Sequence, residues 1–139
     1  MRDITAELVR DLRLLKRDSG EVRTYLVIED DITDARYIAT VLSEDGSIAE
    51  ICRTADEGID KINHGGFSKI FLDLSFPIGN QGVDVLLHLR QMAFGIPVVV
   101  VSGHISREVR QMLEGMNYTV IDKLLPAVKF REEILKTIL

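Results

Sequence analysis

The sequence predicts a single α/β domain built on a parallel sheet of five strands. From Val22 onward, short runs rich in β-branched residues alternate with longer runs in which apolar residues recur at helical spacing. The strand expected at residues 97–101 is apolar throughout, as is typical of a strand that helices cover on both faces. At 139 residues, 46% of them hydrophobic, the chain has the size of one domain and can bury a core.

Residues 1–20 are expected to form an amphipathic helix ahead of that domain, which then occupies residues 21–139. The apolar positions of this helix recur at helical spacing and are Ile4, Leu8, Leu12 and Leu15. Gly20 supplies a stop. These four apolar residues are too few for a stable isolated coiled coil. The helix therefore needs a partner surface. Two roles stay open, packing on the flank of the sheet and formation of a homodimer.

The first half of the domain is expected to hold three strands and two helices. The strand at 24–28 precedes a helix whose inner stripe runs from Ile32 to Leu42, with Asp31 as its N-cap. A weaker strand at 47–52 leads to a helix that carries Ala55, Ile59 and Ile62 and ends at Gly65-Gly66. The third strand occupies 69–72.

The second half begins with a loop at 76–82 that contains proline and glycine. A helix follows, with apolar residues at Val83, Leu86, Leu87 and Leu89. The strand at 97–101 comes next, and then a helix at about 105–114 and a short strand at 118–122. A terminal helix from about 128 to 139 completes the alternation.

Polar side chains stand directly after four of the predicted strands. They are Glu29, Asp30, Asp31, Asp73, Ser102 and Lys123. In a parallel sheet the carboxyl ends of the strands gather on one edge, and ligands bind there at the topological switch point. These residues are therefore the candidates for a functional site.

Three of these carboxylates predict a divalent metal site. If the first and third strands are neighbours, Glu29, Asp30 and Asp73 converge, and like charges that close repel unless a cation lies among them. Mg²⁺ prefers oxygen ligands and is usually held by one or two carboxylates, waters and a phosphate. We expect Asp30 and Asp73 to be direct ligands and Glu29 a water-mediated one. The carbonyl of Ser75 is a further candidate.

Asp73 is the candidate nucleophile, because the apolar residues around it place it at a buried strand end. A carboxylate that attacks phosphorus forms an acyl phosphate, and catalysis then depends on positioning and on neutralising the phosphoryl oxygens. Lys123 would supply a compact positive charge to one oxygen and Ser102 a hydroxyl donor to another. Gly103 leaves room for the group to enter.

Four short motifs in this order resemble a response-regulator receiver domain of two-component signalling. They are Tyr25-Leu-Val-Ile-Glu-Asp-Asp31, Ile70-Phe-Leu-Asp-Leu-Ser-Phe-Pro77, Val98-Val-Val-Val-Ser-Gly103 and Val120-Ile-Asp-Lys123. The resemblance implies a flavodoxin-like, doubly wound sheet of strand order 2-1-3-4-5 with helices on both faces. It implies autocatalytic, Mg²⁺-dependent phosphorylation of Asp73 and not a conventional enzyme. The implied donor is a sensor histidine kinase or a histidine phosphotransfer protein, and the signal would pass by contact to a downstream target protein.

The chain departs from the family pattern at three places. Proline usually follows the lysine directly, but here Leu124-Leu125 precede Pro126. The loop between Pro77 and Gly82 is one residue longer than usual. Three residues before Lys123, where the family has a switching Tyr or Phe, this chain has Val120. Phosphorylation could therefore survive while the usual readout does not.

Other interpretations stay open. An acidic run after a strand often only caps the next helix. A haloacid-dehalogenase-type phosphatase uses the same residue order, but it needs a second Asp where this chain has Ser75. A receiver-like module that binds partners without phosphate is a further alternative. If the chain is phosphorylated, Ser75 and His104 could tune how long the phosphate lasts.

Composition excludes several other classes of function. The net charge of −5 argues against direct binding of nucleic acid. No apolar run approaches the length of a membrane span, and the N-terminus does not resemble a signal peptide. The single Cys52 fits a packed thiol in a reducing compartment, so we expect a soluble cytoplasmic protein.

Overall fold

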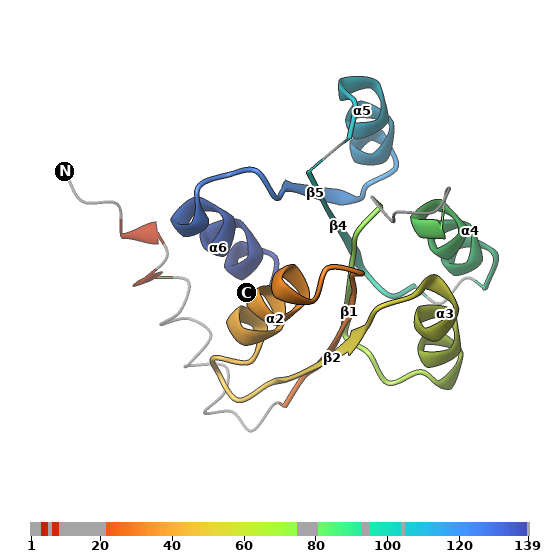
Figure 1. Cartoon of the computed structure of the whole chain (residues 1–139), viewed down its shortest axis with the longest axis horizontal. Coiled ribbons are helices and arrows are strands. Elements are labelled where there is room, and N and C mark those ends of the chain that lie inside the picture. The colour runs from red at the N-terminus through yellow and green to blue at the C-terminus, as the bar shows by residue number, and fades with distance from the viewer. Residues whose placement is uncertain are drawn as a thin grey trace.

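In the described part of the chain, five parallel strands form one sheet that five helices cover (Figure 1). The computed structural model describes residues 4–5, 7–8, 22–74, 81–92, 95–103 and 105–138. The strands are β1 (Thr24–Ile28), β2 (Ile48–Cys52), β3 (Lys69–Leu72), β4 (Val98–Ser102) and β5 (Thr119–Asp122). The helices are α2 (Ile32–Leu42), α3 (Ala55–His64), α4 (Gln81–Met92), α5 (Arg107–Gly115) and α6 (Ala127–Lys136). The strand order is β2-β1-β3-β4-β5, which confirms the predicted doubly wound sheet.

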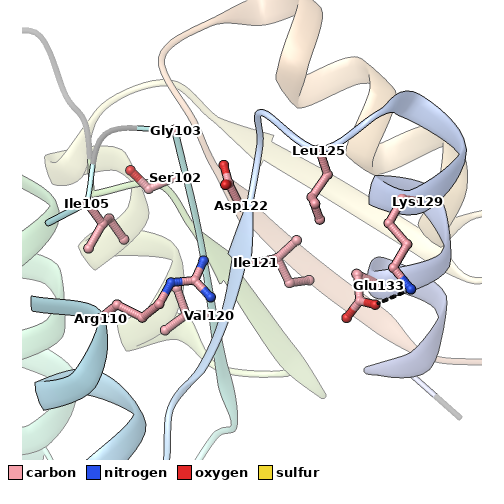
Figure 2. Close-up of a pocket in the computed structure, with 10 residues that line it drawn as sticks. All are labelled: Ser102, Gly103, Ile105, Arg110, Val120, Ile121, Asp122, Leu125, Lys129 and Glu133. Carbon is pink, nitrogen blue, oxygen red and sulfur yellow. Dashed lines mark ion pairs between the residues drawn. The ribbon is translucent and has the colours of Figure 1, made fainter. Parts of the chain in front are cut away.

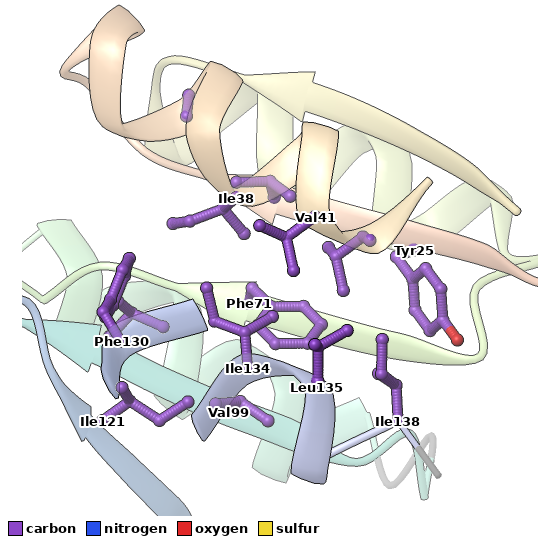
Figure 3. Close-up of a cluster of buried hydrophobic side chains, with 14 residues drawn as sticks. Tyr25, Ile38, Val41, Phe71, Val99, Ile121, Phe130, Ile134, Leu135 and Ile138 are labelled. Carbon is purple, nitrogen blue, oxygen red and sulfur yellow. The ribbon is translucent and has the colours of Figure 1, made fainter. Parts of the chain in front are cut away.

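Two hydrophobic clusters fill the space on the two faces of the sheet. Tyr25 and Val27 point to one face, where α2 and α6 pack, and Figure 3 shows this cluster with Phe71 at its centre. Leu26 and Ile28 point to the other face, where residues of α3, α4 and α5 pack. This alternation follows from the period of two in a strand. β4 is buried along its whole length, as its apolar sequence predicted.

The register of the strands brings their carboxyl ends to the same edge of the sheet. Ile28 pairs with Leu72, and Ser102 pairs with Asp122. Backbone hydrogen bonds continue one residue further, from Glu29 N to Cys52 O at 2.9 Å and from Asp73 N to Ile28 O at 3.0 Å. The two acidic residues that follow β1 and β3 are therefore held by the ladder itself.

Side-chain caps begin three of the helices. Asp31 Oδ1 accepts a hydrogen bond from Asp34 N at 3.0 Å, which confirms Asp31 as the N-cap of α2. Thr54 and Ser106 make the equivalent contacts for α3 and α5. The residue that ends α3 is Gly65, whose φ of 76° lies in the region that favours glycine.

Replacing Asp31 by alanine is expected to lower the free energy of unfolding by about 1 kcal/mol, because the cap to Asp34 N is lost. Asp31→Asn should change it by only a few tenths of a kcal/mol, because asparagine caps equally well. Urea unfolding of the two variants and the wild type checks the difference. Equal stabilities of the alanine and asparagine variants would contradict the capping role.

The boundaries differ from the predicted ones where the backbone has another partner. Tyr118 was expected in the last strand, but its N–H donates to Leu113 O at 3.0 Å and closes the end of α5, so β5 begins at Thr119. The terminal helix begins at Ala127 and ends at Lys136, earlier than expected at both ends. Most of the predicted N-terminal helix lies outside the described residues. Of residues 4, 5, 7 and 8, the last three are helical, and Leu8 N donates to Ile4 O at 2.9 Å.

Two expectations from composition concern the packing of Cys52 and the absence of a membrane-spanning helix. Cys52 is buried at the end of β2, and burial raises the pKa of its thiol to about 11, as expected for a packed, unreactive side chain. Among the described residues, we find no helix with the length and apolar character that a membrane crossing needs.

Candidate functional site

Three carboxylates converge at the carboxyl edge of the sheet, between β1 and β3. Glu29, Asp30 and Asp73 each place one oxygen within 4.8 Å of the other two. Glu29 and Asp73 are buried, with 1% and 3% of their surfaces exposed, and Asp30 is partly buried. The convergence expected from the sequence is therefore present, and it creates a buried concentration of negative charge.

Lys123 brings a cation into this cluster from the loop after β5. Its Nζ donates to Glu29 Oε1, lies 3.0 Å from Asp34 Oδ2 and lies 3.4 Å from Asp73 Oδ2. Only 15% of the Lys123 side chain is exposed. One ammonium group thus joins residues that come from β1, α2, β3 and β5.

The loop that carries Lys123 is held without a proline next to the lysine. Lys123 N donates to Ser102 O at 3.3 Å, which extends the β4–β5 ladder by one residue. Asp122 closes the turn, because its carboxylate accepts from Leu124 N at 2.8 Å and its carbonyl from Leu125 N at 3.3 Å. None of the peptide bonds described is cis. The displaced Pro126 therefore does not prevent Lys123 from reaching Asp73.

Burial and neighbouring charges shift the pKa values of two groups in the site. Burial, together with the neighbouring Asp73, raises the pKa of Glu29 to about 9, although Lys123 opposes the shift. Burial alone would lower the pKa of Lys123, but hydrogen bonds to Glu29 and Asp34 and the charge of Asp73 raise it above its usual range. The ammonium group is therefore charged at every physiological pH, and the raised pKa of Glu29 indicates that Lys123 does not fully offset the cost of a negative charge on this carboxyl group.

The same residues line an open pocket of about 360 Å³. Its lining consists of Asp30, Asp31, Asp34, Asp73, Gly103, Lys123 and Leu124. Since a water molecule takes about 30 Å³ in the liquid, the pocket has room for a hydrated ion together with a phosphoryl group. We call this space the acidic pocket.

Ser102 lies beside the acidic pocket but lines a different space. It is 3% exposed and faces a pocket of about 400 Å³ bordered by β5, α5 and α6, which we call the lateral pocket (Figure 2). Val120 and Arg110 line this pocket, and a Lys129–Glu133 ion pair of 3.3 Å lies at its far side. Gly103 lines both pockets. The structure thus brings the carboxylates and Lys123 together, and it places Ser102 at the boundary between the acidic pocket and the lateral pocket.

Two of the candidate residues cannot be placed. Ser75, expected to offer a carbonyl to the metal, and His104 lie outside the described residues. The other two histidines make local contacts: His64 Nδ1 lies 2.7 Å from Asp60 O, and His88 Nε2 lies 2.9 Å from Asn63 Oδ1.

Two residues that contact this site were missed in the sequence analysis. Asp34 reaches Lys123 from the first turn of α2, and no spacing in the sequence signals this contact. Arg53 follows β2 and donates from Nε and Nη2 to the carbonyl of Asp30, at 3.3 and 3.1 Å. Arg53 thereby holds the backbone of Asp30, whose side chain lines the acidic pocket.

The chemistry of the donor set fits a hard divalent cation. All three converging groups offer carboxylate oxygens, which Mg²⁺ prefers. Glu29 Oε2 is buried and, within the part of the chain described, has no hydrogen-bond partner. A buried carboxylate oxygen without a partner is costly, and a cation or one of its waters would satisfy it.

Comparison with known proteins agrees with the fold and the site. The model of the response regulator receiver domain family matches residues 25–135. The transcriptional regulatory protein YkoG of Bacillus subtilis is 32% identical over 77 residues, which are 55% of this chain and 33% of that protein. The cell cycle regulator CtrA of Caulobacter vibrioides is 33% identical over 78 residues, or 56% of this chain and 33% of that protein. The chain thus matches about a third of the length of these curated relatives.

Solved structures show the same fold. A CheY-like receiver domain from Methanospirillum hungatei superposes with a TM-score of 0.71 at 23% identity, covering 84% of this chain and 94% of that one. Chemotaxis protein CheY4 of Vibrio cholerae gives a TM-score of 0.70 at 20% identity, covering 85% of this chain and 97% of that one.

The fold and the family match define a signalling domain of two-component systems rather than a conventional enzyme. This chain belongs to the response regulator receiver domain family. The match also removes the haloacid-dehalogenase alternative, in agreement with Ser75 at the position where that family needs an acid.

Proposed function

We propose that Asp73 accepts a phosphoryl group from a phosphohistidine donor in a Mg²⁺-dependent reaction. The observation that carries the proposal is the position of the Lys123 ammonium, 3.4 Å from Asp73 Oδ2 beside the cluster of three carboxylates. A buried cation next to a buried carboxylate prepares the site for the negative charge that a phosphoryl group adds. The raised pKa of Glu29 supports a further cation in the same place.

In the proposed reaction, an oxygen of the Asp73 carboxylate attacks the phosphorus of the donor. A P–O bond forms, the P–N bond to the donor imidazole breaks, and the electron pair of that bond stays on the ring nitrogen. With acetyl phosphate, the bond that breaks is P–O, and acetate leaves with the electron pair. The acidic pocket positions the two reactants and supplies charge, which is most of what phosphoryl transfer requires.

Each residue of the site has one role in this proposal. Asp30 and Asp73 bind the metal directly, Glu29 binds it through water, and the carbonyl of Ser75 adds a ligand. The bound metal supplies positive charge to the phosphoryl oxygens. Lys123 contacts one of these oxygens, and the hydroxyl of Ser102 donates to another.

The proposed partners follow from the family. A sensor histidine kinase or a histidine phosphotransfer protein is the donor, and a downstream target protein receives the signal by contact. The division into a helical segment at 1–20 and a receiver domain at 21–139 is part of the proposal, with homodimer formation as one role for the segment. The buried, unpaired thiol of Cys52 supports a cytoplasmic location.

Intact-mass measurement after incubation with acetyl phosphate tests the acceptor. Wild-type protein with Mg²⁺ is expected to gain the mass of one phosphoryl group, and removal of Mg²⁺ by EDTA should abolish the gain. Asp73→Asn should show no gain, because the amide replaces the attacking carboxylate. Asp56→Asn, which changes an exposed carboxylate in the first turn of α3 outside the acidic pocket, is the control and should still gain the mass. An adduct on Asp73→Asn would contradict the assignment.

A module that binds its partners without phosphate is the second candidate. Val120 favours it, because none of the described residues that line the lateral pocket with it is aromatic. Wild-type protein that is folded yet gains no mass under any condition would support this candidate over the first.

A further inference from the structure

Asp34 makes a contact in the acidic pocket to which the proposed reaction gives no role. Its Oδ2 lies 3.0 Å from Lys123 Nζ, closer than the 3.4 Å between Lys123 and the acceptor Asp73. Unlike Glu29 and Asp73, Asp34 is not buried, since 43% of its side chain is exposed. The ammonium group therefore lies between a buried acceptor and an acid at the mouth of the pocket.

The cap of α2 does not use the Asp34 side chain. The N-terminus of α2 is capped by Asp31, and Asp34 contributes only its backbone N–H to that cap. Among the described residues, the one hydrogen-bond partner of the Asp34 carboxylate is Lys123. Its contact with Lys123 is thus separable from the structure of the helix.

The charge of Asp34 opposes the arrival of a phosphoryl group. Phosphorylation of Asp73 would replace the single charge of its carboxylate by the nearly two negative charges of an acyl phosphate, in a pocket that also holds Asp30, Asp31 and Asp34. Lys123 would have to turn its donors to the phosphoryl oxygens, and the contact with Asp34 competes for them. Removing the charge of Asp34 would release those donors and reduce the repulsion.

We propose that Asp34 is a positioning residue that holds Lys123 toward the mouth of the pocket and thereby restrains phosphoryl binding at Asp73. This inference rests on the proposed function, because it assigns a regulator to the same site. The ion pair between Asp34 and Lys123 forms in the unphosphorylated protein. It weakens or breaks when the Lys123 ammonium binds the phosphoryl oxygens instead. Asp34 therefore sets how readily the site is occupied, without touching the reacting atoms.

The test measures the affinity for beryllofluoride in the presence of Mg²⁺ by calorimetry and the rate of adduct formation with acetyl phosphate by intact mass. Asp34→Asn is expected to bind beryllofluoride about threefold to tenfold more tightly than wild type and to form the adduct faster by a similar factor. Asp34→Glu keeps the charge and the reach to Lys123, so it should restore values close to those of wild type.

Asp31→Asn is the matched control. It removes the same charge from the same helix end and the same pocket, and asparagine keeps the cap, but Asp31 makes no contact with Lys123 in the described structure. Its effect on beryllofluoride affinity should be clearly smaller than that of Asp34→Asn. Circular dichroism and thermal unfolding establish that both variants are folded.

The outcomes separate this inference from the function on which it rests. Wild-type protein that binds beryllofluoride and forms the adduct, with Asp34→Asn no different from Asp31→Asn, would overturn the restraint but leave the acceptor in place. Weaker binding by Asp34→Asn would also overturn it, because Asp34 would then assist Lys123. Wild-type protein that takes neither ligand would overturn both proposals together.

Discussion

Replacing Lys123 by methionine is expected to slow phosphorylation of Asp73 by acetyl phosphate about a hundredfold or more, the usual cost of losing a charge-stabilising group in a dry site. Lys123 Nζ lies 3.4 Å from Asp73 Oδ2, and 15% of the lysine side chain is exposed. Methionine has a similar length and fills the same space, so the change removes charge more than volume. The rate of adduct formation, followed by intact mass at saturating Mg²⁺, is the measurement.

Lys129→Met is the matched control for this prediction. Lys129 lies on α6 at the lateral pocket and pairs with Glu133, away from the acidic pocket. Its loss should leave the phosphorylation rate within about twofold, since exposed ion pairs contribute little. Lys123→Arg adds a second comparison, because a planar guanidinium keeps the charge but not the compact shape of an ammonium. A Lys123→Met protein as fast as wild type would remove Lys123 from the reaction.

In EDTA, the stability of the protein is expected to fall as the pH rises from about 5 to about 9, because of Glu29. The pKa of Glu29 is about 9 in the folded protein and about 4.5 as a free side chain, so between these values the folded state holds one more proton than the unfolded state. The stabilising effect of this proton is complete below the lower pKa and is lost as the pH approaches the higher one. The slope contributed by one such group is at most about 1.4 kcal/mol per pH unit.

Urea unfolding at several pH values checks this expectation. Glu29→Gln cannot titrate, so its stability should lose the part of the slope that Glu29 contributes. Glu108→Gln, at an exposed position in the first turn of α5, should keep the wild-type slope. Saturating Mg²⁺ should flatten the slope of the wild type, because a cation near Glu29 offsets the cost of its charge. A wild-type slope that Glu29→Gln leaves unchanged would assign the effect to other groups.

Much of the fold could be predicted because the local signals agree with one another. The apolar run in β4 predicted a strand buried on both faces, and Asp31 was correctly predicted as a helix cap. The convergence of Glu29, Asp30 and Asp73 followed from strand order alone, since the carboxyl ends of neighbouring parallel strands meet.

The remaining features depend on side-chain directions and competing hydrogen bonds that a sequence does not contain. Asp34 meets Lys123 because of the angle at which α2 leaves β1, which no pattern of residues in α2 specifies. Ser102 lines the lateral pocket and not the acidic pocket, and the strand pattern alone does not tell which of two adjoining spaces a residue at a strand end meets. Tyr118 was assigned to a strand because it extends the apolar pattern, but its N–H is used to end the preceding helix.

The single backbone position Gly103 borders both the acidic pocket and the lateral pocket, so the two spaces are thermodynamically linked if Ser102 turns when the acceptor is occupied. Linkage between two binding sites is reciprocal. Consider a small molecule that binds against Val120 and favours one position of Ser102. It would change the affinity of the acidic pocket for beryllofluoride by some factor, and bound beryllofluoride would change the affinity for the small molecule by the same factor. The lateral pocket is therefore a place from which the state of Asp73 could be read, or altered, without any contact with the carboxylates.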